Sequence, residues 1–215
     1  MATIAIFGGF GYAGGAIRDE ALKRGHSVIA VGRSADPSEN RPGLEVRRGD
    51  IHDASLVEAL ADEADVIVVA VPGREIDGRK LVQAVGPLAR AAAGGGARLG
   101  VVGGAGSLRV SEDGPRLVDT PEFPEGAKNE ALSHAEVLTA LRETGGDVDW
   151  FYLSPAAGFG SYNPGEATGA YRVGGDILLA DANGTSYISG ADYALAFVDE
   201  IEQARHHRER FTVAY

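Results

Sequence analysis

The sequence contains no cysteine, which excludes disulfide scaffolds, zinc sites built on thiolates and catalysis by a thiol. It also has no run of lysine or arginine. Its 20 lysines and arginines are outnumbered by 31 aspartates and glutamates, which gives a formal net charge of −11. Such a charge repels phosphate polyanions, so we expect no nucleic-acid partner. No apolar run approaches the roughly 20 residues of a membrane-spanning helix, so we expect no membrane partner either. Residues 1–7 lack the charged start of a signal peptide, and we expect a cytoplasmic protein.

What is present is typical of a globular protein, with 44% hydrophobic and 24% charged residues in a chain of 215. Apolar runs alternate along the chain with segments of helical period. Strands are expected at 4–7, 27–31, 44–46, 66–71, 99–102, 150–153 and 211–213. Helices are expected at 12–24, 54–62, 76–93, 127–144 and 190–204. This alternation predicts one α/β domain over residues 1–215, a Rossmann-type doubly wound, mainly parallel sheet with helices on both faces.

The segment from about 155 to 185 departs from this alternation. It is rich in glycine, proline and asparagine and has no long periodic stretch. An irregular stretch of this length within a compact domain is more often functional than structural. We therefore expect a loop there that forms the substrate pocket.

Glycines recur at the end of the first expected strand, in the order Gly8-Gly9-Phe10-Gly11-Tyr12-Ala13-Gly14. Gly8 permits a sharp turn, Gly11 allows close approach of a pyrophosphate, and Gly14 allows the helix to pack on the strand. The helix N-terminus then presents free N–H groups to phosphates. We expect this loop, with Phe10 and Tyr12, to bind a dinucleotide. The alternative is a glycine-rich turn that holds no ligand.

The end of the second expected strand favours NADP(H) over NAD(H). NAD-specific folds place an acidic residue there, but this strand ends in Val31-Gly32-Arg33-Ser34. Arg33 can bind a 2′-phosphate through its guanidinium, with Ser34 as a second donor. A solvated arginine at the edge of a loop is the alternative.

Two further turns leave the same expected sheet edge. Asp50 and Ile51 follow the third strand, where a carboxylate can accept from an adenine amino group. Val71 and Pro72 follow the fourth strand and leave room for a ribose. Both segments could equally be ordinary turns.

These residues also carry a resemblance to a known family. The glycines at 8, 11 and 14, the Gly49-Asp50 pair and the Gly-Gly-Ala-Gly-Ser at 103–107 resemble the atypical short-chain dehydrogenase/reductases. The segments 188–193 and 210–213 are similar to one NAD(P)H-binding branch. That branch contains proposed NADH-flavin reductases, biliverdin reductase B-like proteins and NmrA-like proteins. The resemblance covers almost the whole chain and implies the fold and the cofactor, but not the substrate.

The resemblance also implies catalytic candidates. Ser107 stands where the family carries a Ser or Thr beside the nicotinamide, which would lie between Ser107 and Pro155. His134 stands where biliverdin reductase B-like proteins also carry a histidine, and it could act as a general acid. The alternatives are a loop or cap serine and a packing histidine. No tyrosine has a lysine four residues later, so the Tyr-x-x-x-Lys pair of classical members is missing.

In the family, the segment after the sixth strand lines the nicotinamide and substrate pocket. Here that segment contains Ala156 and Phe159. With Tyr162 and Tyr171, Phe159 could form an aromatic lid over a planar substrate. Aromatic anchors of a long loop are the alternative.

Other chemistries are less well supported. There is no Gly-x-Ser-x-Gly elbow of a hydrolase and no Gly-Lys-Ser/Thr phosphate loop. We expect no metal site, because His206 and His207 are adjacent, face different directions and are expected to be solvated.

We therefore expect an NADP(H)-dependent reductase that transfers hydride to a small planar acceptor such as a flavin, a quinone or a biosynthetic carbonyl or enone intermediate. One alternative is a non-catalytic, NmrA-like sensor of the dinucleotide. Another is an epimerase, isomerase or dehydratase that retains its NAD(P). The sequence predicts neither the identity of the substrate nor the oligomeric state.

Overall fold

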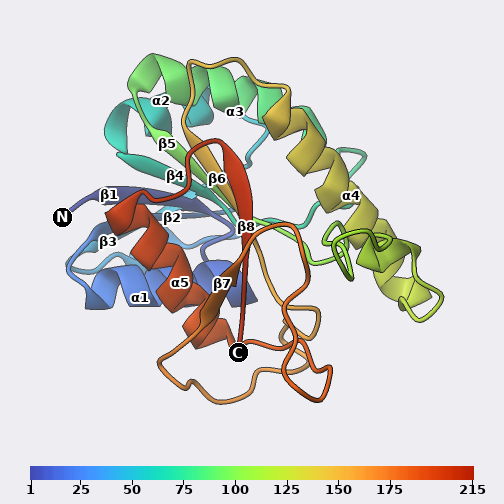
Figure 1. Cartoon of the computed structure of the whole chain (residues 1–215). Helices are drawn as coiled ribbons and strands as arrows, with labels where there is room; N and C mark the ends of the chain where they lie inside the picture. Colours follow the sequence, from blue (N-terminus) through green and yellow to red (C-terminus); the bar gives the residue numbers. More distant parts are fainter.

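The computed structural model describes all 215 residues, and its strands form one sheet of eight in the order β3-β2-β1-β4-β5-β6-β8-β7 (Figure 1). Neighbouring strands are parallel except for β7 and β8. The strands are β1 Thr3–Phe7, β2 Ser27–Gly32, β3 Leu44–Arg48, β4 Val66–Val69, β5 Arg98–Val102, β6 Trp150–Ser154, β7 Arg172–Gly174 and β8 Glu209–Ala214. The predicted doubly wound, mainly parallel sheet is confirmed.

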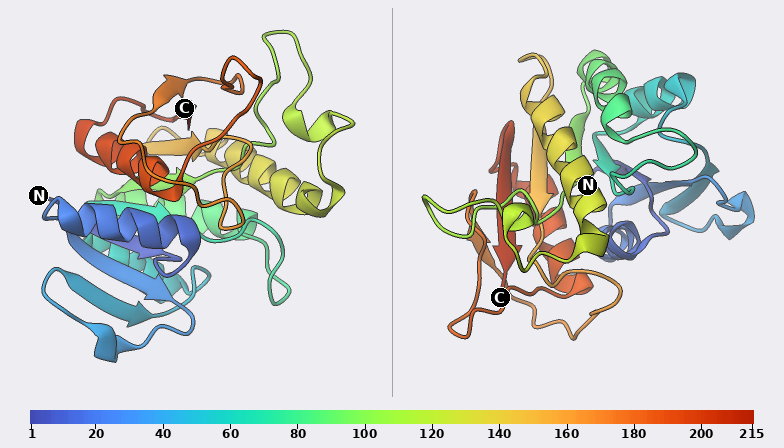
Figure 2. Two further views of the ribbon diagram at one scale, coloured as in Figure 1. Left: turned by 90° about the horizontal axis from the view of Figure 1, so that it is seen from below. Right: turned by 90° about the vertical axis from the view of Figure 1, so that its right-hand side faces the viewer.

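Helices cover both faces of this sheet. One face carries α1 and α5, which pack side by side (Figure 2), and the other carries α2, α3 and α4. The α-helices are α1 Tyr12–Lys23, α2 Ala54–Glu63, α3 Val82–Gly95, α4 Glu125–Arg142 and α5 Gly190–Gln203. None of them combines the length and the apolar character that crossing a membrane would require.

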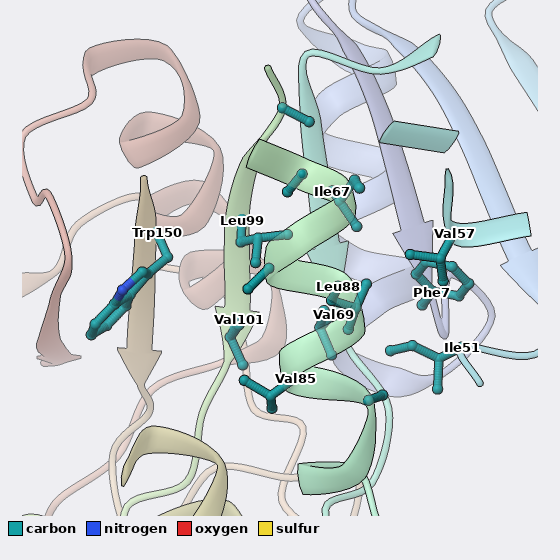
Figure 3. Packing of buried hydrophobic residues seen from close by; sticks show 14 of the residues in the cluster. Phe7, Ile51, Val57, Ile67, Val69, Val85, Leu88, Leu99, Val101 and Trp150 are labelled. Atoms are coloured by element: carbon teal, nitrogen blue, oxygen red, sulfur yellow. The ribbon is translucent and has the colours of Figure 1, made fainter. Parts of the chain in front are cut away.

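The two helical layers enclose two hydrophobic cores, one on each face of the sheet. Under α2, α3 and α4, side chains from the strands meet those of the helices, as Ile67 and Leu99 do with Leu88 (Figure 3). All four residues of β4 are buried, because a central parallel strand is covered on both faces. This explains why β4 is a continuous apolar run in the sequence.

The sheet has its topological switch point at β1. The chain continues from β1 to β2 and β3 on one side, and then crosses to β4 on the other side of β1. Connections that leave the carboxyl ends of β1 and β4 therefore diverge. Open α/β sheets bind ligands in the crevice formed at such a point.

Three expectations about the elements were wrong. The helix expected at 76–93 begins only at Val82, because Asp77 and Gly78 have positive φ angles of 51° and 77° and form a turn. Strand β7, within the loop at 155–185, was not expected, because it is short and exposed at the sheet edge. His206 is only partly solvated, since its ring stacks on Phe211 at 3.8 Å and its Nδ1 lies 2.7 Å from a Glu200 oxygen, whereas His207 is exposed as expected.

The loop at 155–185 is fastened to the start of α5. The Asp192 carboxylate, 2% exposed, accepts from the N–H groups of Thr168 at 2.6 Å and Gly169 at 3.0 Å. The hydroxyl of Tyr215 donates to the same carboxylate at 2.5 Å. Burial opposes its charge, but these bonds keep the pKa of Asp192 below its ordinary value. The loop is therefore held by buried polar contacts.

Candidate functional site

The turn between β1 and α1 is packed too closely for side chains. Gly8 has a φ of +83°, and a Cβ there would lie 2.2 Å from the carbonyl oxygen of Ala70. A Cβ on Gly14 would lie 2.2 Å from the oxygen of Gly8. Gly8 therefore packs the turn against the connection after β4, and Gly14 brings α1 into backbone contact with the turn; the sequence predicts a sharp turn at Gly8 and close packing at Gly14.

The first turn of α1 provides a potential anion site. Its N-cap is Gly11, which has no side chain to accept from the N–H groups that begin the helix. These donors lack partners within a helix, and they lie at the positive end of its dipole. A phosphate group can accept hydrogen bonds from these donors, and its negative charge is favoured at this end of the dipole.

A cleft of about 330 Å³ opens beside this turn, at the switch point of the sheet. It is lined by the carboxyl ends of β1 and β2 and by the connections that follow β1, β2, β3 and β4. Eight of the residues predicted to bind the cofactor line this cleft: Gly8, Gly11, Arg33, Ser34, Asp50, Ile51, Val71 and Pro72. The remaining five, Phe10, Tyr12, Gly14, Ser107 and Pro155, lie outside its lining.

Arginine side chains are concentrated in the lining of the cleft. Arg33, Arg74 and Arg79 line it, and their guanidinium groups pair with the carboxylates of Asp77 at 2.5 Å, Glu130 at 3.2 Å and Asp50 at 3.1 Å. Burial, followed by the nearby Arg79, lowers the pKa of His52 in the same lining, which disfavours the charged form of this ring. In a chain of net charge −11, this concentration of guanidinium groups favours an anionic ligand.

Two ion pairs cross the mouth of the cleft, and both come from one turn. Residues Ile76 to Arg79 form this turn, which projects from the sheet as a thin teal-green loop in the left view of Figure 2. A carboxylate oxygen of Asp77 lies 2.5 Å from Nη1 of Arg33. Nη2 of Arg79 lies 3.1 Å from an oxygen of Asp50. The turn therefore contacts both charged side chains that the sequence assigns to the adenosine end of the cofactor, Arg33 and Asp50.

Glu130, which the sequence analysis missed, holds the base of this segment. Its carboxylate accepts from the N–H groups of Gly73 at 2.7 Å and Arg74 at 3.2 Å, and it lies 3.1 Å from Nε2 of His134. Burial opposes the charge, but the bonds from His134, Gly73 and Arg74 outweigh it and lower the pKa of Glu130 to about 2. The spacing of four residues between Glu130 and His134 on a helix was the available signal.

This low pKa predicts acid sensitivity. A carboxylate whose pKa is lower in the folded than in the unfolded chain stabilises the fold above about pH 4.5, and that contribution is lost as the pH falls toward 2. Because its side chain is 34% exposed, we discount the effect of Glu130→Gln to a loss of about 1–2 kcal/mol at pH 7. Denaturant unfolding at pH 7 and near pH 2 should show this difference disappearing in acid.

The matched control is Glu136→Gln. Glu136 lies on the same helix and pairs with Lys80 at 3.3 Å, but its side chain is 48% exposed. We expect a change of less than about 0.5 kcal/mol at either pH. Equal losses in the two variants would contradict the role assigned to Glu130.

His134 lies between the connections that follow β4 and β5. A Cβ on Gly73 would lie 3.0 Å from its ring, and one on Gly104 would lie 3.2 Å from its Cβ. The residue is 8% exposed, and its Nδ1 is buried without a hydrogen-bond partner. Packing and pairing with Glu130 account for its position, and a role in proton transfer stays a prediction.

Ser107 is bound by an arginine that the sequence analysis also missed. Nη1 of Arg210, whose side chain is 4% exposed, donates to the Ser107 hydroxyl at 3.3 Å, while its Nε donates to Asp176 at 2.6 Å. A guanidinium has only donors, so the Ser107 oxygen accepts and its own hydrogen can point toward another group. The arrangement suits a serine that orients a carbonyl, which stays a prediction for Ser107.

The predicted substrate residues lie apart from the cleft. Pro155 and Ala156 are buried directly after β6. Phe159 packs between Tyr12, at 5.3 Å, and Tyr193, at 4.5 Å, on the face of the sheet that carries α1 and α5. These contacts anchor the loop.

The other two aromatic side chains of the loop differ in exposure. Tyr171 donates a short hydrogen bond to Asp199 of α5, whereas Tyr162 is 77% exposed. The structure therefore does not gather Phe159, Tyr162 and Tyr171 into one lid. Their contact with a substrate stays a prediction.

Comparison with known proteins agrees with this geometry. The profile of a family described as NAD(P)H-binding matches residues 8–204. An uncharacterized protein of Bacillus subtilis, YwnB, is 39% identical over 98% of this chain and 97% of its own.

Two solved structures are also similar over nearly their whole lengths. One, from Streptococcus pneumoniae, is proposed to be an NADH-flavin reductase; it is 36% identical, with a TM-score of 0.87 over 100% of this chain and 99% of its own. The other, from Bacteroides thetaiotaomicron, is proposed to be an epimerase; it is 34% identical, with a TM-score of 0.85 over 99% of this chain and 96% of its own. With the glycine turn, the cleft and the family match in agreement, the chain belongs to the NAD(P)H-binding family of atypical short-chain dehydrogenase/reductases.

Proposed function

We propose that this protein is an NADP(H)-dependent oxidoreductase that transfers hydride to a small planar acceptor, such as a flavin, a quinone or a biosynthetic carbonyl or enone intermediate. One observation carries the proposal. The anion-binding turn at the start of α1 opens into a cleft lined by three arginines in an otherwise acidic protein. The proposed partners of the protein are accordingly small molecules rather than nucleic acids or membranes.

The residues present fit a dinucleotide. Gly8 and Gly14 allow a tight turn that a Cβ at either position would prevent by a clash with backbone. The first turn of α1 offers N–H donors to a pyrophosphate. Arg33 and Ser34 would hold a 2′-phosphate, and Asp50 would accept from the adenine amino group. The nicotinamide would lie between Ser107 and Pro155, at the same sheet edge.

When bound, the cofactor supplies the hydride, and the protein supplies position and polarity. The Ser107 hydroxyl, fixed by Arg210, would donate to a carbonyl of the nicotinamide or of the substrate. Because no Tyr-x-x-x-Lys pair is present, the chain works mainly by alignment of the two reactants, which can supply roughly 7–11 kcal/mol of a barrier. His134 is the candidate for any proton that the acceptor requires.

The role of His134 predicts a change in pH dependence. We expect His134→Gln to lower kcat by roughly 10²-fold and to remove one limb of the pH–rate profile, because an amide cannot supply the proton. Its NADPH affinity, measured in parallel, should stay within twofold of wild type. An unchanged profile would leave His134 with a packing role only.

The proposal is tested by titration of the pure protein with NADPH and NADH, followed by addition of an acceptor. Tight NADPH binding, with oxidation by FMN, riboflavin or a quinone, is the expected result. Tight binding without oxidation by any acceptor would favour a non-catalytic sensor. Failure to bind either nucleotide would overturn the proposal.

A second candidate is an epimerase, isomerase or dehydratase that retains its cofactor. The relative from Bacteroides thetaiotaomicron that is proposed to be an epimerase favours it. Such an enzyme would carry bound nucleotide through purification and would cause no net redox change.

A further inference from the structure

The end of β2 lacks the acidic residue of NAD-specific folds, yet the structure supplies a carboxylate at that place from another element. The strand ends with Gly32, and Arg33 and Ser34 follow it. An oxygen of Asp77, which follows β4, lies 2.5 Å from Nη1 of Arg33. The guanidinium assigned to a 2′-phosphate is therefore already paired with an anion of the chain itself.

A tight turn fixes the position of the Asp77 carboxylate. Ile76 and Arg79 exchange two backbone hydrogen bonds of 2.9 and 3.0 Å, and Asp77 and Gly78 between them have φ angles of 51° and 77°. Positive φ at both central residues is the pattern of a tight two-residue hairpin turn, for which Asp-Gly is a preferred sequence. Asp77 is thus held at the tip of a compact turn.

The turn is also fixed on both sides of its tip. Arg79 pairs with Asp50 at 3.1 Å, across the cleft. Glu130 binds the N–H groups of Gly73 and Arg74 at the base of the segment. Asp77 is therefore directed at Arg33 by contacts on each side of it.

The two cofactors would meet this pair differently. A 2′-phosphate carries close to two negative charges, so it must displace the Asp77 carboxylate from Arg33 or lie against it at an electrostatic cost. A ribose 2′-hydroxyl can instead donate to the carboxylate, as it does to the acidic residue of NAD-specific folds. The same side chain would therefore weaken NADPH binding and support NADH binding.

We propose that Asp77 determines cofactor specificity: its carboxylate, paired with Arg33 where a 2′-phosphate would bind, disfavours NADPH relative to NADH. This inference rests on the proposed function, since it places the adenosine ribose of the cofactor beside Arg33. It assigns to the turn after β4 a role that the end of β2 has in NAD-specific folds.

The substitution that tests this role should leave the fold intact. The side chains of Arg33 and Asp77 are 55% and 72% exposed, so their ion pair contributes little to stability. Asparagine tolerates the left-handed conformation and preserves the shape of the side chain. Asp77→Asn therefore removes the charge and keeps the turn.

The experiment compares the dissociation constants of NADPH and NADH for wild type, Asp77→Asn and Glu75→Gln. Glu75→Gln is the matched control, because Glu75 is exposed in the same segment and makes no side-chain hydrogen bond or ion pair. We expect Asp77→Asn to tighten NADPH binding about 3- to 10-fold and to leave NADH binding unchanged or up to about threefold weaker. We expect Glu75→Gln to change both constants by the same factor.

The possible results distinguish a failure of the role of Asp77 from a failure of the proposed function. If wild type binds NADPH but Asp77→Asn shifts the NADPH/NADH ratio no more than Glu75→Gln does, the inference is overturned and the proposed function stands. If wild type binds neither nucleotide, both are overturned. A shift of the ratio toward NADH in Asp77→Asn would also overturn the inference, because it would show that the carboxylate favours NADPH.

Discussion

Gly14→Ala is expected to destabilise the protein by about 2–4 kcal/mol and to abolish measurable NADPH binding. The added Cβ would lie 2.2 Å from the Gly8 oxygen and 3.0 Å from the Cβ of Ala70. The first of these neighbours is backbone within the turn, so α1 would have to move off the sheet. That movement would displace the N–H groups that we assign to the pyrophosphate. Denaturant unfolding and nucleotide titration measure the two effects separately.

The adjacent glycine provides a matched control. A Cβ on Gly15 would meet only the Gly9 oxygen, at an ordinary 3.8 Å. Since alanine is the better helix former, Gly15→Ala is expected to stabilise the protein by roughly 0.5–1 kcal/mol and to bind NADPH as wild type does. Equal stability and affinity in the two variants would contradict the close packing. Lost stability with normal NADPH affinity in Gly14→Ala would leave the turn with a structural role alone.

Arg33→Ala is expected to weaken NADPH binding by about 10- to 100-fold while NADH binding stays within twofold of wild type. The magnitude follows from the roughly 1.5–3 kcal/mol that a hydrogen bond to a charged group contributes. Removal of the guanidinium also leaves the Asp77 carboxylate without its ion-pair partner, so this charge would repel a 2′-phosphate. NADH lacks the 2′-phosphate that we assign to Arg33, so its affinity is the internal reference. Fluorescence titration with each nucleotide gives both constants.

Arg41→Ala controls for the loss of one positive charge from the surface. Arg41 is exposed just before β3, whose amino end lies at the edge of the sheet opposite the cleft. We expect that variant to change NADPH and NADH binding equally and slightly. If Arg33→Ala also weakens both nucleotides equally, Arg33 does not contact the 2′-phosphate.

Local patterns in the sequence were sufficient to predict the sheet and the glycine turn. The alternation of apolar runs with helical segments restricts the chain to a doubly wound sheet, since parallel strands require crossover helices. Gly8, Gly11 and Gly14 were identifiable because their spacing follows from a single turn between one strand and one helix. The same reasoning placed Arg33 and Asp50 at strand ends, and both line the cleft.

The sequence was less informative where contacts join distant segments. Asp77 reaches Arg33 across 44 positions, and Glu130 holds Gly73 across 57. No periodicity relates such residues, since only the fold brings the connection after β4 against the end of β2 and the start of α4. The Asp77-Gly78 pair did signal a turn, but the helical pattern around it led to a helix that begins six residues too early.

By itself, therefore, the sequence determined the fold, the family and the edge of the sheet to which we assign the dinucleotide, because these depend on patterns within one strand–helix unit. Only the tertiary structure decided which charged groups meet in the cleft. It pairs Arg33 with Asp77, Asp50 with Arg79 and Ser107 with Arg210. The physical reason is that hydrogen bonds and ion pairs act over a few ångströms in space, whereas the order of residues fixes only neighbours along the chain.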